Sequence, residues 1–474
     1  MEQELLLRSV VRLHSYCRPV DFLKPYIIAE RVKSVGTGSI IRITDNFFYI
    51  LTCSHCVDNA DSVTVMLPLL GMMEFHSVVV ALSPDNDLAL VALPTAPELN
   101  ALALRPLPLG TSVNLRLGQK LVAVGYPLGQ TALKVSDGVY AGFQERLQHT
   151  VSISPGNSGG PLLNERGELV GVNNSGVMEA SNVGFAVPIE MFLLDERRMF
   201  AQPPTGGPRP ERVLKSLKFG FTFNPITVNH LRTVGFDAKG GVYISNVIAN
   251  TPAARAHLEE GDIILKFDAY VLDNMGDVYV EWNYQKVRFV DALDRVAPKP
   301  YEFIVWKAQS RTQQTVRMTP VAEDYGSLQT LYPPYQPLEY TILFGLVIMP
   351  LTLNHIADSR TLIAYFINQT VKDLATPRLV VTHVVAGSVA QTQTKIETGD
   401  EITHVNNHVV KTLSELNEAL ANTVRSSTGQ LLVNVTTHNG KIILMSMEDA
   451  IENERNAEKQ QMYTAHPFFV ATVP

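Results

Sequence analysis

The sequence is poor in the features that mark several large classes of protein. Only 3 of its 474 residues are cysteine (Cys17, Cys53 and Cys56), which is too few for a disulfide framework and lacks the spacing of a zinc site. The longest apolar stretches, such as residues 341–353, are shorter than the roughly 18 to 20 residues that cross a bilayer. We therefore expect no metal, no cofactor and no membrane span.

Charge of one sign is also scarce. Lys and Arg together number 39 against 46 for Asp and Glu, and no basic run interrupts the mixed pattern, so a nucleic-acid partner is disfavoured. The first residues, MEQELLLRSVVRLHSYC, lack the basic and then unbroken apolar segments of a signal peptide. With so few cysteines, this pattern favours a reducing intracellular compartment, although the sequence does not identify which one.

The pattern of short strands divides the chain. Short apolar, β-rich runs separated by Gly, Pro, Asn and Asp extend from residue 9 to about residue 188, which is typical of an all-β barrel or sandwich. The segment AQPPTGGPRPER that follows cannot continue a helix or a central strand. We predict a β domain at residues 1–200 and a linker at 201–213.

A weak internal repeat organises the second half. KFGFTF at 218–223 recurs as LFGLVI at 343–348, and each copy is followed by a Gly-Asp pair, a strand and an amphipathic helix, at 288–296 and 413–420. These observations predict two small αβ modules, at 214–322 and 341–450, joined by a linker at 323–340. A charged, helical tail at 451–474 completes the chain.

The most specific motif is SPGNSGGPL at 154–162. A serine hydroxyl becomes a strong nucleophile only when a base removes its proton and N–H donors meet the developing oxyanion. The glycines of this motif allow the sharp turn that brings the N–H groups of Gly156 and Ser158 into one pocket. We therefore predict Ser158 as nucleophile, with the backbone of Gly156, Asn157 and Ser158 as the oxyanion hole.

A base and a carboxylate must come from elsewhere in the chain. In YILTCSHCV an apolar strand leads directly to His55, a setting that suits an imidazole at the edge of a cleft. A third residue should fix the tautomer of this imidazole. Asp87 directly precedes an apolar strand and is preferred over Asp85, two residues earlier. The chain order His55, Asp87, Ser158 is that of chymotrypsin.

These motifs resemble those of the HtrA/Deg family of serine proteases. ILTCSHCV, DLALVAL and SPGNSGGPLLN are similar to its histidine, aspartate and serine motifs, and the two modules resemble its PDZ domains. The segments WNYQKVRFVDAL and LFGLVIMPLTL are similar to the plant and fungal Deg-like branch, in which the second PDZ domain is divergent. The resemblance implies a mainly β fold, with a chymotrypsin-like double β-barrel protease domain followed by two small αβ PDZ-like domains.

The resemblance also implies roles for individual residues. His55 would be the general base, Asp87 its orienting carboxylate and Ser158 the nucleophile. Asn157 is neutral, so it cannot pair with a newly cut N-terminus, and activation should be conformational. The family further implies a homo-oligomer based on trimers, with the apolar segment Leu5 to Leu13 as a candidate contact.

Specificity should follow from the walls of the S1 pocket. Ser152, six residues before the nucleophile, places no carboxylate at the base of the pocket for Lys or Arg. A small or medium apolar P1 residue is therefore expected, although the polar Ser152 leaves this open. The predicted pocket residues are Ser152, Ile153, Asn173, Asn174, Ser175, Phe185 and Ala186.

The modules are expected to bind polypeptide, with C-terminal peptides as one class of ligand. A PDZ domain adds such a peptide as a strand, and backbone N–H groups of a glycine-containing loop hold its carboxylate. In the second module, internal docking or oligomer contacts remain an alternative to peptide binding, and the apolar tail FFVATVP could fill a groove in cis or in a neighbour. The predicted loops are Lys218, Phe219, Gly220 and Phe221, and Leu343, Phe344, Gly345 and Leu346.

Two functions from different classes follow. One is an ATP-independent serine endopeptidase for unfolded or damaged proteins, or for protein processing. The other is a catalytically silent scaffold or chaperone that binds peptides. The intact His, Asp and Ser motifs favour the enzyme, because a scaffold has no chemical need for all three.

Overall fold

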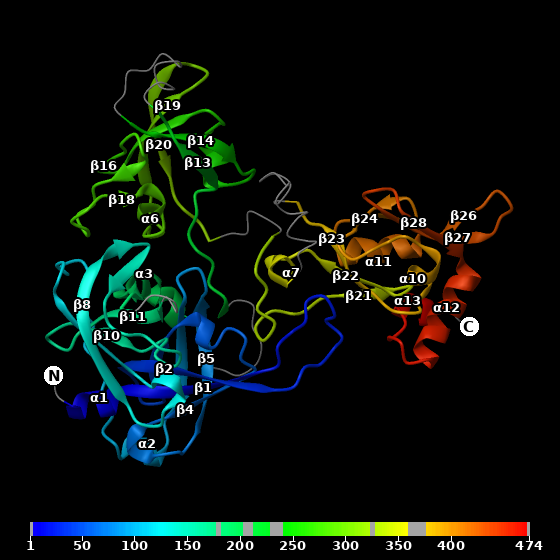
Figure 1. Ribbon diagram of the computed structural model, residues 1–474. Helices are drawn as coiled ribbons and strands as arrows, with labels where there is room; N and C mark the ends of the chain where they lie inside the picture. Colours follow the sequence, from blue (N-terminus) through cyan, green and yellow to red (C-terminus); the bar gives the residue numbers. More distant parts are fainter. Residues whose placement is uncertain are drawn as a thin grey trace. The chain divides into compact units, whose positions relative to one another are not determined.

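A computed structural model describes residues 3–176, 182–201, 212–227, 240–322, 328–358 and 376–471. The chain divides into two compact units, one made of residues 1–18 and 31–325 and the other of residues 19–30 and 326–474. Figure 1 traces the helices and strands along the chain. Within the described residues, no helix is both long enough and apolar enough to cross a membrane.

The first unit begins with a closed six-stranded antiparallel barrel in the order β1-β2-β3-β6-β5-β4. Its strands alternate or run continuously apolar because their inner faces fill the barrel. A short helix, α1 (Gln3–Ser9), leads into it. The strands are β1 (Val10–Cys17), β2 (Val32–Ile43), β3 (Phe47–Thr52), β4 (Ser62–Met66), β5 (Phe75–Ser83) and β6 (Leu88–Pro94).

A second closed six-stranded barrel follows, in the order β10-β11-β12-β9-β8-β7. The short helix α2 (Pro97–Asn100) lies between the barrels in sequence, and α3 (Ile189–Phe200) follows the last strand. The strands are β7 (Lys120–Gly125), β8 (Lys134–Gln144), β9 (Arg146–His149), β10 (Pro161–Leu163), β11 (Leu169–Gly176) and β12 (Gly184–Pro188).

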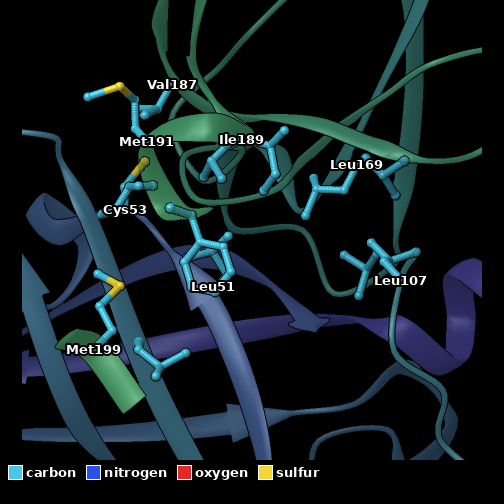
Figure 2. Close-up of a cluster of buried hydrophobic side chains, with 14 of the residues drawn as sticks. Leu51, Cys53, Leu107, Leu169, Val187, Ile189, Met191 and Met199 are labelled. Atoms are coloured by element: carbon cyan, nitrogen blue, oxygen red, sulfur yellow. The ribbon is translucent and has the colours of Figure 1, made fainter. Parts of the chain in front are cut away.

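One apolar cluster holds the two barrels and α3 together. Figure 2 shows Leu51 and Cys53 of the first barrel beside Val187, Ile189 and other side chains of the second barrel and α3, and all four are fully buried. Burial of such side chains contributes about 1.5 to 3 kcal/mol each. This cluster therefore packs the two barrels against each other.

The rest of the first unit is a small αβ module. Its main sheet has the order β13-β14-β15-β19-β20, and β13 is the end strand among those described. Aromatic rings fill the core, including Phe219, Phe267 and Phe303. The elements are β13 (Phe221–Pro225), β14 (Val242–Val247), α5 (Pro252–Arg255), β15 (Ile263–Phe267), β16 (Tyr270–Val271), β17 (Asp277–Val278), β18 (Val287–Arg288), α6 (Phe289–Leu293), β19 (Tyr301–Lys307) and β20 (Thr312–Met318).

The second unit is built on an eight-stranded sheet. Six strands have the order β21-β22-β23-β24-β27-β26, and in addition β25 pairs with β24 and β28 pairs with β27. Residues 19–30 also belong to this unit, where Phe22 meets His355 edge to face. The elements are β21 (Thr341–Leu343), β22 (Leu346–Pro350), α7 (Leu353–Asp358), β23 (Leu379–Val384), α10 (Val389–Gln393), β24 (Glu401–Val405), β25 (His408–Val409), α11 (Leu413–Ala421), β26 (Val424–Arg425), β27 (Leu431–Thr437), β28 (Ile442–Ser446), α12 (Met447–Lys459) and α13 (Pro467–Ala471).

The predicted fold class is confirmed. The chain is mainly β, with two closed six-stranded barrels followed by smaller sheets that carry short helices. The helix predicted at 413–420 is α11, and the one at 288–296 is the shorter α6. The linker predicted at 201–213 and the start of the one at 323–340 lie largely outside the described residues, so the domain limits stay predictions.

Candidate active site

The carboxylate of Asp87 binds both the backbone N–H and the imidazole ring of His55. Strand β3 ends at Thr52, and a 3₁₀ turn (Ser54–Cys56) then carries His55, whose side chain is 45% exposed. Asp87 precedes β6 with a left-handed backbone (φ 53°), which turns its carboxylate toward this ring. Its Oδ2 lies 2.8 Å from His55 Nδ1, and its Oδ1 accepts from the His55 backbone N–H at 2.9 Å. Asp85, the alternative, is exposed in the preceding turn.

Asn174 connects Ser158 to Asp87 through two hydrogen bonds. The Ser158 hydroxyl donates to the Asn174 carbonyl oxygen at 2.8 Å, and the Asn174 side-chain amide donates to Asp87 Oδ2. Within the part of the chain described, no hydrogen bond joins Ser158 to His55. Such bonds are often long in unliganded sites and tighten when substrate binds. The three predicted residues therefore belong to one cluster in which Asn174 is the link.

The backbone before Ser158 adopts a turn that only glycine suits. Gly156 has φ 98°, and a Cβ there would lie 2.3 Å from the Tyr126 carbonyl oxygen. No described group accepts a hydrogen bond from the N–H of Gly156 or of Ser158, so both remain free to bind a substrate oxygen. The N–H of Asn157, the third predicted member, instead donates to the Ser154 carbonyl at 3.0 Å.

Thr37 was missed by the sequence analysis. This buried residue of β2 donates from its N–H to the Ser158 carbonyl at 2.9 Å and from its hydroxyl to the Gly156 carbonyl at 2.6 Å. Its hydroxyl also accepts from the Tyr126 N–H at 3.1 Å. Thr37 therefore ties the serine turn of the second barrel to the first barrel. Thr37 lies in the segment GTGSII, which matches no motif, so the sequence contains no indication of this role.

Replacing Thr37 by valine tests this positioning role. The change keeps the side-chain volume but leaves a buried carbonyl and a buried N–H without their partner, at a cost of about 1 to 3 kcal/mol each. We expect kcat to fall by about 10- to 100-fold, with little change in KM, because the serine turn shifts relative to His55. Steady-state kinetics on a peptide substrate measure this split. Thr44→Val, at an exposed turn, is the control, and equal behaviour of the two variants would contradict the role.

The pKa of His55 predicts the pH dependence. Burial alone would lower this pKa, but the hydrogen bonds with Asp87 and Cys56 outweigh it and raise the pKa above its usual 6.5. A protonated imidazole cannot accept the serine proton, so kcat/KM should fall as the pH drops through this pKa. We therefore expect the midpoint of the acidic limb above pH 6.5. A kcat/KM profile with its midpoint below that value would contradict the assignment.

Cys53, His55 and Asp87 have potential metal ligand atoms within 4.8 Å of one another. Their chemistry does not suit a metal. The imidazole and carboxylate are already bonded to each other, and the Cys53 thiol lies 3.2 Å from the Asn173 carbonyl, to which it donates. Burial raises the pKa of Cys53 well above its usual value, so it stays a thiol and not the thiolate that metals bind. All three cysteines of the chain are free thiols.

The predicted specificity residues come from two strands and one loop. Asn173 and Asn174 lie on β11 and Phe185 and Ala186 on β12, where Asn173 pairs with Ala186 and Ser175 with Phe185. Ser152 is exposed and Ile153 half-buried in the loop before Ser158. Asn173 faces inward and holds the serine turn, with its carbonyl accepting from the Gly159 N–H at 2.8 Å. The side chain of Ser175 lies outside the description.

The two predicted peptide loops share the conformation of their glycine but not of the phenylalanine before it, because Phe344 is left-handed (φ 56°) and Phe219 is not. Phe219-Gly220 and Phe344-Gly345 each precede a strand, and both glycines have left-handed φ angles, of 87° and 88°. Each glycine carbonyl accepts one N–H, from Ile248 in the first module and Val385 in the second. Lys218 pairs with Val321 in the first module, and Phe221 and Leu346 begin the strands that follow the loops. Leu343 ends β21.

Comparisons with known proteins agree with this architecture. Residues 36–172 match the trypsin-like peptidase domain, and residues 365–436 match the PDZ domain. The chain is 32% identical over 50% of its length to "Putative serine protease HhoA" of Synechocystis and 34% identical over 52% to "Putative protease Do-like 14" of Arabidopsis thaliana. It covers 61% and 59% of those proteins.

Solved structures show the same fold. An HtrA-type protease AlgW with a decapeptide is matched over 68% of this chain and 98% of that one, with a TM-score of 0.50 and 21% identity.

The serine protease Do-like HtrB of Bacillus subtilis is another relative in sequence, 29% identical over 51% of this chain and 55% of its own length. The predicted resemblance to HtrA/Deg proteases is thus confirmed, and the chain spans between 55% and 61% of the length of these three curated relatives.

Proposed function

We propose that this chain, with a peptidase domain and a PDZ domain similar to those of HtrA/Deg serine proteases, is an ATP-independent serine endopeptidase. Its substrates would be unfolded or damaged proteins, or proteins that it processes. One observation carries the proposal: Ser158, Asn174, Asp87 and His55 form a continuous hydrogen-bonded cluster at the junction of two barrels. Similarity to proteins named serine proteases supports it.

The reaction would proceed through an acyl-enzyme. The Ser158 oxygen attacks the scissile carbonyl carbon while its proton passes to Nε2 of His55, and Asp87 stabilises the imidazolium through Nδ1. The N–H groups of Gly156 and Ser158 would bind the oxyanion. His55 then returns the proton to the leaving amine as the C–N bond breaks. Water, deprotonated by His55, releases the acyl group in the same way.

Activation would be conformational. The Ser158 hydroxyl donates to the Asn174 carbonyl, so it must rotate away from that oxygen before His55 can accept its proton. A substrate backbone that adds beside β11 would compete for this same carbonyl and release the hydroxyl. The neutral, buried Asn157 offers no carboxylate for a newly formed N-terminus.

Assembly and peptide capture complete the proposal. We infer a trimer-based homo-oligomer from the family resemblance. The candidate contact at Leu5 to Leu13 would rest on the half-buried Leu5 and Leu7, because Leu6, Val10 and Leu13 are buried. The first module, with Phe219 and Gly220 ahead of the end strand β13, would take extended or C-terminal peptides.

Digestion of a protein in two folding states tests this function. α-Lactalbumin with its disulfides reduced is unfolded, whereas the oxidised form is compact. We expect the chain to cleave the reduced form and to spare the oxidised one, with fragments followed by mass spectrometry. A sample treated with phenylmethylsulfonyl fluoride is the control. Fragments that persist after this treatment would exclude the serine mechanism.

The alternative is a silent scaffold that binds unfolded chains without cutting them. The contact of Ser158 with Asn174 and not with His55 is the observation that favours it. In that case the reduced α-lactalbumin would bind and stay intact. Suppressed aggregation with no fragments would decide for the scaffold.

A further inference from the structure

The second module differs from the first at the two places that a C-terminal peptide needs. Those places are the open edge of the strand that follows the glycine loop, and the N–H groups of the loop that hold the terminal carboxylate. The two loops can be compared because each contains a left-handed glycine, Gly220 or Gly345, directly before the strand that follows. In the first module, β13 ends the described sheet, and no described group accepts from the Phe219 N–H.

In the second module a strand of the chain already covers the edge. β21 pairs with β22 in an antiparallel hairpin, with Thr341 opposite Ile348 and Leu343 opposite Leu346. Phe344 and Gly345 form its two-residue turn, and both have left-handed φ angles, as this turn type requires. On its other side β22 pairs with β23. Both sides of β22 are therefore occupied, and an added peptide strand has no place to pair.

A carboxylate of the chain also accepts a hydrogen bond from an N–H group of the glycine loop. Glu454 of α12 is fully buried, and its Oε1 accepts from the Phe344 N–H at 2.6 Å. The same oxygen accepts from the Tyr463 hydroxyl at 3.0 Å, and Oε2 accepts from the His466 N–H at 2.9 Å. Burial raises the pKa of this carboxyl, and these three donors oppose the rise. A buried carboxyl held by three donors is a built site, not a surface contact.

The tail anchors this carboxylate against the module. Phe469 of α13 is fully buried, with its ring 5.4 Å from that of Phe344. His466 also meets Asn417 of α11, at 3.1 Å from Nε2 to Oδ1. The C-terminal residues therefore contact both the glycine loop and α11.

We propose that the second module is occupied in cis, with β21 as its strand ligand and Glu454 as its carboxylate ligand, so that it docks the chain's own C-terminal helices and takes no free C-terminus. Peptide capture would then belong to the first module alone. This refines the proposed role of the modules and does not depend on proteolysis. It is tested in the full chain carrying Ser158→Ala, so a failure of the peptidase proposal would not affect the outcome.

Residue-resolved hydrogen exchange compares the two loops within one molecule. The Phe344 amide should exchange at least about tenfold more slowly than the equivalent Phe219 amide, because it opens only when Glu454 leaves. Glu454→Leu should abolish most of this difference, since it removes both acceptor oxygens and leaves the Phe344 N–H without its partner. Glu452→Leu, exposed on the same helix, should leave it unchanged. Equal rates for the two amides in the parent chain would overturn the proposal, whether or not the Glu454 variant folds.

A photoreactive peptide tests the consequence. The probe is an octapeptide ending in Tyr-Ala-Val with a free carboxylate and carrying benzoylphenylalanine, and its C-terminal amide is the control. No crosslink should fall on β22 or α11, which agrees with the proposal whether or not the first module is labelled. Crosslinks on β22 or α11 that require the free carboxylate would overturn it.

Discussion

Replacing Ser158 by alanine should lower kcat for peptide cleavage by about 10⁵- to 10⁶-fold. The variant retains binding of substrate and the N–H groups of the serine turn but has no nucleophile to form the acyl-enzyme. The fold should survive, because the hydroxyl makes one hydrogen bond, to the Asn174 carbonyl, which water can replace at this partly exposed site. Single-turnover cleavage of an internally quenched peptide measures the loss.

The control for this substitution is Ser154→Ala. Ser154 lies in the same turn, and only its carbonyl takes part in the turn's hydrogen bonding, by accepting from the Asn157 N–H. We expect its activity to stay within about threefold of the parent chain, since the half-buried Ser154 hydroxyl makes none of the hydrogen bonds described for the turn. A Ser158→Ala variant that cleaves at the parental rate would show that another residue is the nucleophile.

Asp87→Asn should lower kcat by about 10⁴-fold. The carboxylate accepts from the His55 ring, from the His55 backbone N–H and from the Asn174 amide. An asparagine has one acceptor oxygen, so its NH2 group must face one of these donors or hold the imidazole in the wrong tautomer. The groups that bind the substrate stay in place in this variant, so KM should change little. The loss of activity should therefore appear mainly in kcat.

The exposed neighbour provides the matched control for Asp87. Asp85→Asn removes the same charge two residues earlier in the same turn, where the side chain is exposed. Its kcat should remain within about twofold of the parent, as expected for a surface substitution. Equal losses in both variants would mean that net charge, and not the hydrogen bonds of Asp87, determines the rate.

Local sequence predicted the parts of the site that each motif carries by itself. The apolar strand before His55 and the one after Asp87 are β3 and β6, adjacent in the first barrel, so their ends meet. The glycines around Ser158 predicted a turn, and the left-handed Gly156 is at its centre. Thr37 and the side chain of Asn174 could not be predicted, because their roles depend on how two barrels pack and not on a motif.

In the C-terminal half, the sequence repeat predicted the two modules but not the differences between them. The two glycine loops have similar sequences, as the repeat predicted, and Gly220 and Gly345 have the same left-handed conformation, but Phe344 is left-handed and Phe219 is not. The segment before the loop forms an isolated bridge in the first module, between Lys218 and Val321, but pairs with β22 in the second. This choice depends on strand pairing over long sequence distances. The charged pattern of α12 predicted a helix, but the burial of its Glu454 depends on a distant loop.

Covalent labelling of the folded chain tests the central claim most directly. A fluorophosphonate reacts only with a serine whose proton is removed by a base and whose oxyanion is stabilised. After labelling and digestion, mass spectrometry should find the phosphonyl group on Ser158 alone, in amounts that fall strongly in Asp87→Asn. Parent protein that stays unlabelled in the presence of an unfolded substrate, or that is labelled at another serine, would contradict the account.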